Sequence, residues 1–322
     1  MNTLKTVVDA WNGYHSVPVR KKDRKYLNFH TQWGTYRYKV APQGWCTSGD
    51  AYTRRYDDII KDIPHCVKQI DDTMIWGNNM AEIYERTFNY LKTVGENGVI
   101  LNKKKFTFGK SEVDYAGFRI TNDRVLPLEK NLQALKEFPT PKNISDVRSF
   151  FALANNLNFT TKVKEMLKDF RPLLSPKKKF EWTKELNESF IEVKGKLVEQ
   201  AKSGVQKFEM DKWTVLETDY SKDGLGYCLK QKFCKCAMEK GKINPICCES
   251  GYKTILCGSR FTSDPESRYS AVEGELLALE WALYSTKHFT LQNPKLVIST
   301  DHQPLVRLVE NSSLEQLHGK NK

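Results

Sequence analysis

The sequence contains no long hydrophobic run, because no window reaches the roughly 18 uninterrupted apolar residues that a membrane-spanning helix needs. The N-terminal stretch Met-Asn-Thr-Leu-Lys-Thr-Val-Val-Asp also lacks the apolar core of a secretory signal. We therefore expect a protein that neither spans a membrane nor is secreted, and an intracellular location.

An acidic excess is also missing, since 51 Lys and Arg oppose 39 Asp and Glu and give a formal charge of +12 at pH 7. Because no basic amphipathic helix dominates the sequence, this charge favours nucleic acid over a membrane surface as the partner. Basic proteins of other kinds are common, so the charge alone leaves the partner open. Hydrophobic residues make up 39% of the 322 residues, which predicts two or three folded domains rather than disorder.

Cysteines are scarce outside one segment. Cys46 and Cys66 stand alone, whereas the other six of the eight are Cys228, Cys234, Cys236, Cys247, Cys248 and Cys257. This distribution indicates a reduced, intracellular protein rather than a disulfide framework. Cys-x-Cys followed by Cys-Cys allows a zinc site, but two adjacent cysteines chelate one tetrahedral ion poorly, so an ordinary cysteine-rich hairpin is the alternative.

Two adjacent carboxylates, Asp71 and Asp72, lie between two short runs that contain apolar residues, 66–70 and 73–77. Such runs predict a β-hairpin with the two carboxylates at its turn. Neighbouring ionised carboxylates repel each other, and a bound divalent cation relieves that repulsion in a folded protein. A magnesium site is therefore one hypothesis. An ordinary polar turn, in which Asp-Asp is common, is the other.

Two further motifs precede this hairpin. Asp9 lies in a β-rich stretch and is followed by Gly13-Tyr14, and residues 41–45 read Ala-Pro-Gln-Gly-Trp. The order Asp-x-x-x-Gly-Tyr, Pro-Gln-Gly-Trp and x-Ile-Asp-Asp resembles the palm of retroviral-type reverse transcriptases, in particular those of gypsy-type (Ty3/gypsy-like) LTR retrotransposons. Each motif is weak singly, but the joint order and spacing are specific, and the resemblance extends over nearly all of the chain.

This resemblance implies a polymerase site in which Asp9 and Asp71 are the principal magnesium ligands and Asp72 supports them. Two Mg²⁺ ions per site are implied, with Mn²⁺ as the alternative, because two ions act on the attacking and leaving oxygens of a phosphoryl transfer. Tyr14 would lie under the sugar of the incoming deoxynucleoside triphosphate and exclude a 2′ hydroxyl. A core tyrosine is the alternative reading of that position.

The other substrate contacts that the resemblance implies are Gln43, Gly44, Lys104, Lys105, Tyr115 and Gly117. The first two would approach the nucleotide and the template, a lysine of the Lys103-Lys104-Lys105 run would face the nucleotide, and the hairpin of residues 113–120 would grip the primer. A solvated surface is the alternative for the lysine run.

Local patterns predict the elements that carry these motifs. Residues 26–40 suit antiparallel strands around Gly34. A helix is expected from Thr47 or Ser48 to Pro64, and Asn79 is expected to cap a second helix with Ile83, Phe88, Leu91 and Val94 on one face. From Leu128 the character becomes helical, with Ser145 as a further expected N-cap, and it resembles the thumb and connection of gypsy-type enzymes.

A third region carries three more carboxylates. Residues 214–219 form a strand ending on Asp219, a long helix begins near Ser270, and residues 296–300 form a strand followed by Asp301. A strand-end Asp, a helical Glu and a second strand-end Asp resemble ribonuclease H, which implies that Asp219, Glu275 and Asp301 hold two metal ions against the RNA strand of an RNA–DNA hybrid. Glu273 is a nearby rival to Glu275.

We therefore expect an α+β chain with a reverse transcriptase palm over residues 1–122, a thumb and connection over 123–204, and a mixed α/β ribonuclease H-like domain over 205–322. Gln69 stands where the family usually has Tyr or Phe. The chain starts just before Asp9 and stops before the family's last strand and helix, so an internal, truncated piece of a Pol polyprotein is expected, with the fingers mostly missing.

The implied function is RNA-directed DNA polymerase with ribonuclease H activity. Its partners would be an RNA template with a DNA primer, RNA–DNA hybrid, deoxynucleoside triphosphates and other Pol or Gag segments, with no membrane. The family's setting implies cytoplasmic virus-like particles or the nucleus. Two alternatives remain: an inactive nucleic-acid-binding fragment of a decayed element, and a hybrid nuclease whose palm is only a scaffold.

Overall fold

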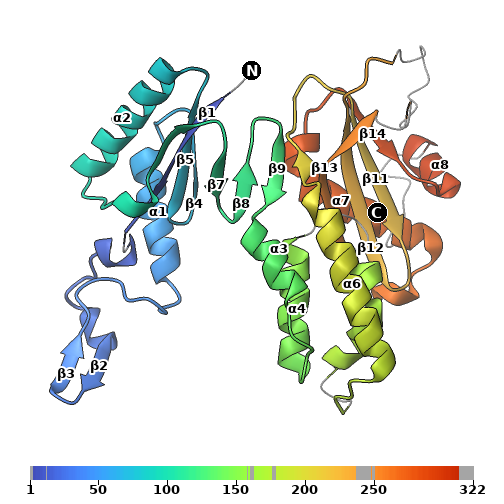
Figure 1. The fold of residues 1–322 in the computed structure, drawn as a ribbon, viewed down its shortest axis with the longest axis horizontal. Helices are drawn as coiled ribbons and strands as arrows, with labels where there is room; N and C mark the ends of the chain where they lie inside the picture. Colours follow the sequence, from blue (N-terminus) through green and yellow to red (C-terminus); the bar gives the residue numbers. More distant parts are fainter. Residues whose placement is uncertain are drawn as a thin grey trace. The chain divides into compact units, whose positions relative to one another are not determined.

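The computed structural model describes residues 3–11, 13–157, 159, 163–175, 179–236, 248 and 251–311. The chain forms two compact units, Met1–Asn122 and Asp123–Lys322, and each contains both helices and strands (Figure 1). This content confirms the predicted α+β fold class. Within the described residues, no helix is both long and apolar enough to cross a bilayer.

The first unit is built on a four-stranded sheet with strand order β4-β5-β1-β6. Its elements are β1 (Leu4–Asp9), β4 (Cys66–Gln69), β5 (Asp72–Gly77), β6 (Thr107–Lys110), α1 (Ser48–Ile60) and α2 (Met80–Glu96). Val8 and Ile75 of the sheet share one core with Tyr56 and Tyr90 of the two helices. Every second residue of β5 is buried, which is the period of a strand with one covered face.

Helix α2 begins where its sequence predicts, because the Asn79 side chain accepts a hydrogen bond from Glu82 N at 2.9 Å. Its buried face agrees with the predicted one at Ile83 and Val94 and differs from it at the other two positions. Phe88 is 57% exposed and Leu91 36% exposed, whereas the buried residues are Ile83, Thr87, Tyr90 and Val94. Helix α2 contacts β5 and α1, and this packing buries Thr87 and Tyr90 in place of Phe88 and Leu91.

Two hairpins and three short 3₁₀ helices complete the first unit. These are β2 (Asn28–Thr31), β3 (Gly34–Arg37), β7 (Val113–Tyr115), β8 (Phe118–Ile120), η1 (Gly13–Ser16), η2 (Arg24–Tyr26) and η3 (Lys103–Lys105). Both hairpins are antiparallel, as predicted. Ala116 and Gly117 both have positive φ, at 49° and 87°, which suits a tight two-residue turn.

The second unit opens with helices packed around aromatic residues. Its elements up to residue 206 are β9 (Arg124–Pro127), α3 (Glu129–Lys136), α4 (Ile144–Asn156), α5 (Val163–Leu167), η4 (Lys168–Leu174), α6 (Lys184–Lys202) and β10 (Val205–Gln206). Phe150, Phe170 and Phe190 lie in the core, with ring centroids 4.7–6.5 Å apart. The predicted N-cap of α4 was wrong: Asn143, not Ser145, accepts from Asp146 N at 2.9 Å.

The second unit continues as a mixed sheet with strand order β13-β12-β11-β14. Its elements are β11 (Thr214–Tyr220), β12 (Gly224–Lys232), β13 (Tyr252–Phe261), η5 (Glu266–Arg268), α7 (Ala271–Thr290), β14 (Leu296–Ser299) and α8 (Gln303–Asn311). Strands β11 to β13 pair antiparallel, and β14 pairs parallel to β11 after the α7 crossover. Leu216 and Leu229 of the sheet pack with Ala282 of α7.

Arg171 joins the helical part of this unit to the sheet. Its guanidinium donates to the carbonyls of Asp223 at 3.1 Å and Thr262 at 2.6 Å, and it lies over the Phe261 ring at 4.7 Å. The division of this unit at residue 204 stays a prediction, since the chain clusters as one body across that point.

Candidate active sites

The first candidate site lies where β1 meets the β4–β5 hairpin. In the antiparallel pairing of β1 with β5, Asp9 stands opposite Asp72, and Ala10 N donates to Asp71 O at 2.9 Å. Three carboxylate residues from two distant stretches of sequence are thereby brought to one end of the sheet. Neither stretch of sequence alone predicts that these residues lie close together.

The hairpin turn differs from the predicted one by one residue. Gln69 pairs with Asp72, so the turn consists of Ile70 and Asp71, and Asp72 is the first residue of β5. Ile70 has a φ of +54°, a conformation that is strained for a β-branched side chain. The strained turn places Asp71 at the tip and leaves Asp72 fixed by strand pairing.

One lysine and burial set the electrostatics of this group of carboxylates. Lys105 Nζ lies 2.7 Å from Asp9 Oδ2, and η3, which carries this lysine, is tied to β1 by Asn102 N donating to Asp9 O at 2.9 Å. Burial, followed by the Asp9 carboxylate, raises the pKa of Asp72. Asp71 Oδ1 is buried and accepts no hydrogen bond. Such an oxygen is a ready ligand for a hard cation.

Tyr52 and Tyr115 lie beside the carboxylates, and Tyr14 packs on Tyr52. The half-buried Tyr14 ring packs on Tyr52 with centroids 5.5 Å apart, and burial, followed by the Asp71 carboxylate, raises the pKa of Tyr52. The Tyr115 hydroxyl donates to Val67 O at 3.2 Å, and its pKa is raised to about 12 by burial first and Asp72 next. Tyr52 was not singled out from the sequence as a site residue, because its helical period marks it only as core.

Gly13 explains why Tyr14 can pack so closely. A Cβ at this position would lie 2.4 Å from the Tyr52 ring, so only glycine lets the chain before Tyr14 approach α1. The other predicted contacts, Gln43, Gly44, Lys104 and Gly117, are exposed.

The second candidate site lies at one edge of the β11–β14 pair. The parallel register sets Glu217 opposite Ser299, so Asp219 and Asp301, each two residues further on, project at the same edge. Both are exposed. Glu275 comes from α7, is 7% exposed, and has an Oε2 atom with no hydrogen-bond partner. Burial first, then the charges of Asp219 and Asp301, raise its pKa to about 7.

The start of α7 distinguishes Glu275 from Glu273, the other candidate carboxylate on this helix. Ser270 and Glu273 form a capping box, in which Ser270 N donates to Glu273 Oε2 at 3.1 Å and Glu273 N donates to Ser270 Oγ at 3.4 Å. Glu273 is therefore part of the helix cap, and Glu275 is the carboxylate that the helix directs toward the two strand ends.

Gly274 permits the close approach of α7 to β11. A Cβ there would lie 2.2 Å from the ring of Tyr220, whose hydroxyl donates to Glu266 O at 2.8 Å. Tyr220 follows Asp219 directly, so the same contact sets the spacing between Asp219 and Glu275. The sequence signal for this role is a glycine inside a long predicted helix, because a glycine there destabilises the helix unless packing requires it.

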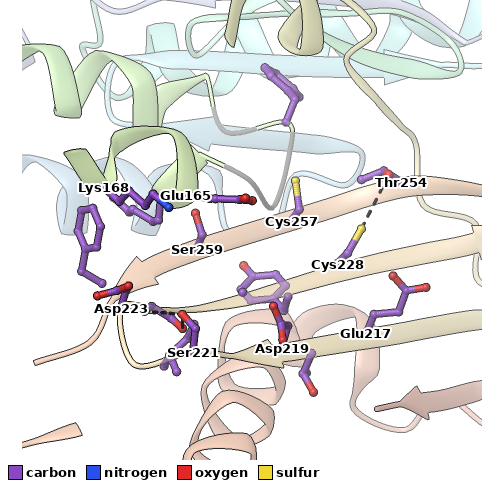
Figure 2. Close-up of a pocket in the computed structure, with 18 of the residues that line it drawn as sticks. Glu165, Lys168, Glu217, Asp219, Ser221, Asp223, Cys228, Thr254, Cys257 and Ser259 are labelled. Carbon is purple, nitrogen blue, oxygen red and sulfur yellow. Dashed lines mark hydrogen bonds between the residues drawn. The ribbon is translucent and has the colours of Figure 1, made fainter. Parts of the chain in front are cut away.

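An open pocket of about 800 Å³ lies over β11, β12 and β13. Figure 2 shows Glu217 and Asp219 on β11 along one side and Glu165 and Lys168 across from them. Glu217 is neutralised by Lys230, whose Nζ lies 2.6 Å from its Oε2. Asp219 therefore faces a cavity that residues of both signs line.

Comparison with known proteins decides the family. A family model described as reverse transcriptase (RNA-dependent DNA polymerase) matches residues 1–120, and one described as an RNase H-like domain found in reverse transcriptase matches residues 209–320. The chain therefore contains a reverse transcriptase domain followed by an RNase H-like domain. Its RNase H-like part carries Asp219, Glu275 and Asp301 within the second matched range.

The similar polyproteins are those of gypsy-type elements, which confirms the predicted resemblance. The Transposon Tf2-3 polyprotein of Schizosaccharomyces pombe is 26% identical over 318 residues, covering 97% of this chain and 22% of the relative. The retrovirus-related Pol polyprotein from transposon gypsy of Drosophila melanogaster is 25% identical over 317 residues, covering 93% and 28%. The chain thus spans about a quarter of the length of these relatives.

Solved structures show the same fold. Foamy viral protease-reverse transcriptase in complex with RNA/DNA hybrid superposes with a TM-score of 0.78 at 20% identity, over 96% of this chain and 40% of that one. The foamy viral protease-reverse transcriptase dRH in complex with dsDNA gives a TM-score of 0.75 at 20% identity, over 97% and 52%.

Proposed function

We propose that this chain carries out RNA-directed DNA synthesis and cleaves the RNA of RNA–DNA hybrids, as the reverse transcriptase and RNase H part of a retrotransposon Pol polyprotein. The observation that carries the proposal is the register of β1 and β5, which sets Asp9 opposite Asp72 and next to Asp71. The matches to the reverse transcriptase and RNase H-like domain models and the second carboxylate group on the RNase H-like sheet support it.

Divalent metal fits both carboxylate groups. Asp71 Oδ1 and Glu275 Oε2 are buried acceptors without hydrogen-bond partners, and carboxylate oxygens are the ligands that Mg²⁺ prefers. We assign Asp9, Asp71 and Asp72 to one magnesium site and Asp219, Glu275 and Asp301 to the other, two ions each, with Mn²⁺ able to replace Mg²⁺. Bound ions would supply stabilisation of charge on the attacking and leaving oxygens.

Lys105 has a second role in this proposal. Its ammonium Nζ lies 2.7 Å from Asp9 Oδ2 and neutralises that carboxylate in the metal-free protein. Burial raises the pKa of the neighbouring carboxyl of Asp72. A metal ion bound by Asp9 would free this lysine while it stays within reach of the site. The lysine would then be able to face the phosphates of the incoming deoxynucleoside triphosphate as a point charge.

Tyr14 serves as the selector against ribonucleotides. Its ring is held by Tyr52 and cannot move deeper, because Gly13 already places the chain in contact with that ring. A sugar lying on the fixed ring leaves no room for a 2′ hydroxyl. Gln43 and Gly44 approach template and nucleotide, Lys104 the nucleotide, and Tyr115 and Gly117 the primer.

The nucleic-acid partners are an RNA template with a DNA primer and the hybrid that synthesis produces. The formal charge of +12 supports binding to a polyanion, and the structural relatives are described in complexes with RNA/DNA hybrid and dsDNA. Affinity that falls steeply with salt is the expected signature.

The deciding experiment is primer extension on an RNA template with Mg²⁺ and deoxynucleotides. The parent chain should extend the primer, and the Asp71→Asn/Asp72→Asn variant should not. Asp58→Asn/Asp62→Asn is the matched control, because it makes the same charge change at two exposed positions at the end of α1. No extension by parent or variant, with template-primer still bound in a gel shift, would reduce the chain to a binding fragment.

Hybrid cleavage is tested separately on an RNA–DNA duplex labelled in the RNA strand. Asp219→Asn should abolish cleavage and leave extension intact, whereas the Asp71→Asn/Asp72→Asn variant should keep cleavage. Cleavage without any extension would favour a nuclease whose palm is a scaffold.

A further inference from the structure

Three cysteines converge at the base of the long connection between β12 and β13. Cys234 and Cys236 follow the end of β12, and Cys248 comes shortly before the start of β13. Their sulfur atoms all lie within 4.8 Å of one another. Cys228 and Cys257 are different, since they are buried within the sheet and stand opposite each other on β12 and β13.

A backbone hydrogen bond that does not involve sulfur joins the two arms of the connection, and further hydrogen bonds fix each arm. Phe233 N donates to Gly251 O at 2.8 Å, and Gly251 N donates to Cys248 O at 2.9 Å. Lys232 Nζ donates to Cys236 O at 2.6 Å. The sheet thus extends past β12 and β13 and delivers cysteines from both arms to one point.

The spacing suits a thiolate-bound metal. A tetrahedral zinc ion with Zn–S bonds of about 2.3 Å separates its sulfur ligands by roughly 3.8 Å. Sulfur atoms within 4.8 Å therefore need to approach by about 1 Å or less, which partly exposed side chains allow. Mg²⁺ prefers oxygen ligands, so this cluster selects a different and softer ion than the two carboxylate sites.

We propose that Cys234, Cys236 and Cys248 bind one zinc ion that closes the base of the β12–β13 connection. Closing a loop restricts the unfolded chain, so the ion stabilises the RNase H-like part without contributing to catalysis. Binding deprotonates the thiols and leaves one coordination position for water or another side chain. Cys247 lies outside the described residues, and as the immediate neighbour of Cys248 it is a poor second ligand to the same ion.

Metal analysis of the full chain tests this directly. After loading with Zn²⁺ and exhaustive dialysis, the parent should retain one equivalent, and Cys236→Ser should retain at least tenfold less at limiting zinc. Cys46→Ser is the control, because Cys46 is exposed like Cys236 but stands alone, and its zinc content should equal that of the parent. Equal zinc in Cys236→Ser and the parent, or none in the parent, would overturn the proposal.

A second measurement needs no variant. Cysteine alkylation is followed residue by residue by mass spectrometry, with and without Zn²⁺ at 100 times its dissociation constant, which leaves about 1% of the site unbound. Alkylation of Cys234, Cys236 and Cys248 should slow by roughly 100-fold, and that of Cys46 should not change. Zinc that protects all four equally, or none, contradicts a site at this cluster. Adding Mg²⁺ in place of Zn²⁺ should protect none of them.

Discussion

Replacing Glu275 by Gln should stabilise the metal-free protein, even though it removes a carboxylate from the candidate RNase H site. Glu275 is 7% exposed, and burial, then Asp219 and Asp301, raise its pKa from 4.5 to about 7. The folded state therefore holds the Glu275 proton more tightly than the unfolded state does. Stability falls as pH rises from the unfolded pKa to the folded one, and it stays lower above about pH 7.

The magnitude follows from the shift. Each pKa unit corresponds to about 1.4 kcal/mol, so a rise from 4.5 to about 7 sets an upper bound of about 3 kcal/mol. Asp219 and Asp301 are both exposed, and water screens their part of the effect. We expect Glu275→Gln to gain about 2 kcal/mol at about pH 8 and nothing at about pH 4, where the parent carboxyl is protonated in both states.

Urea unfolding in EDTA across this pH range measures the difference. Glu280→Gln is the control, since Glu280 lies on the same helix and is exposed, and it should change stability little at any pH. Adding Mg²⁺ should then stabilise the parent and not Glu275→Gln. A variant that is less stable than the parent at about pH 8, or a gain independent of pH, would refute the assignment of Glu275 to a buried, cation-binding position.

Three further results are expected. Lys105→Met should raise Mg²⁺ affinity about two- to five-fold without nucleotide, because the exposed ion pair with Asp9 no longer competes with the metal ion. The same variant should raise KM for deoxynucleotides. Isothermal titration measures the Mg²⁺ affinity, and steady-state kinetics measures KM. Glu266→Gln should destabilise by about 1–2 kcal/mol at neutral pH, because the Arg260 hydrogen bond lowers the pKa of Glu266 to about 2, and the loss should vanish as pH falls from about 4.5 to 2. Gly274→Ala should lower stability and hybrid cleavage together, since its Cβ would meet a tyrosine ring at 2.2 Å.

Each of these has a matched control. Lys104→Met removes the same charge one residue away, where the side chain is exposed, and should leave Mg²⁺ affinity unchanged. Glu280→Gln again controls for the loss of one carboxylate on an exposed surface. Gly195→Ala changes a helical glycine with no atom within 4 Å of the new Cβ, so it should be neutral or stabilising. Equal effects in variant and control would show that the contacts named here do not carry the result.

Local sequence signals predicted the start of several elements correctly. Asn79 caps α2 and Ser270 begins the capping box of α7, because a cap needs only a few neighbouring residues. The wrong predictions arose where two local readings were possible or where packing and strand register decided. Ser145 and Asn143 are both acceptable caps, and Phe88 lies on an apolar face that packing did not select. The hairpin turn shifted to Ile70 and Asp71 because strand register fixes it.

The sequence by itself determined the kinds of chemistry in this protein: motifs in order, strand-end carboxylates and a cysteine-rich segment. Only the tertiary structure decided which groups meet. It set Asp9 opposite Asp72 and paired Lys105 with Asp9. It also made Glu273 part of the helix cap and directed Glu275 inward. Distances between residues far apart in sequence depend on register and packing, and the resulting burial and charge fix each pKa. The composition of the chain determines neither these distances nor these pKa values.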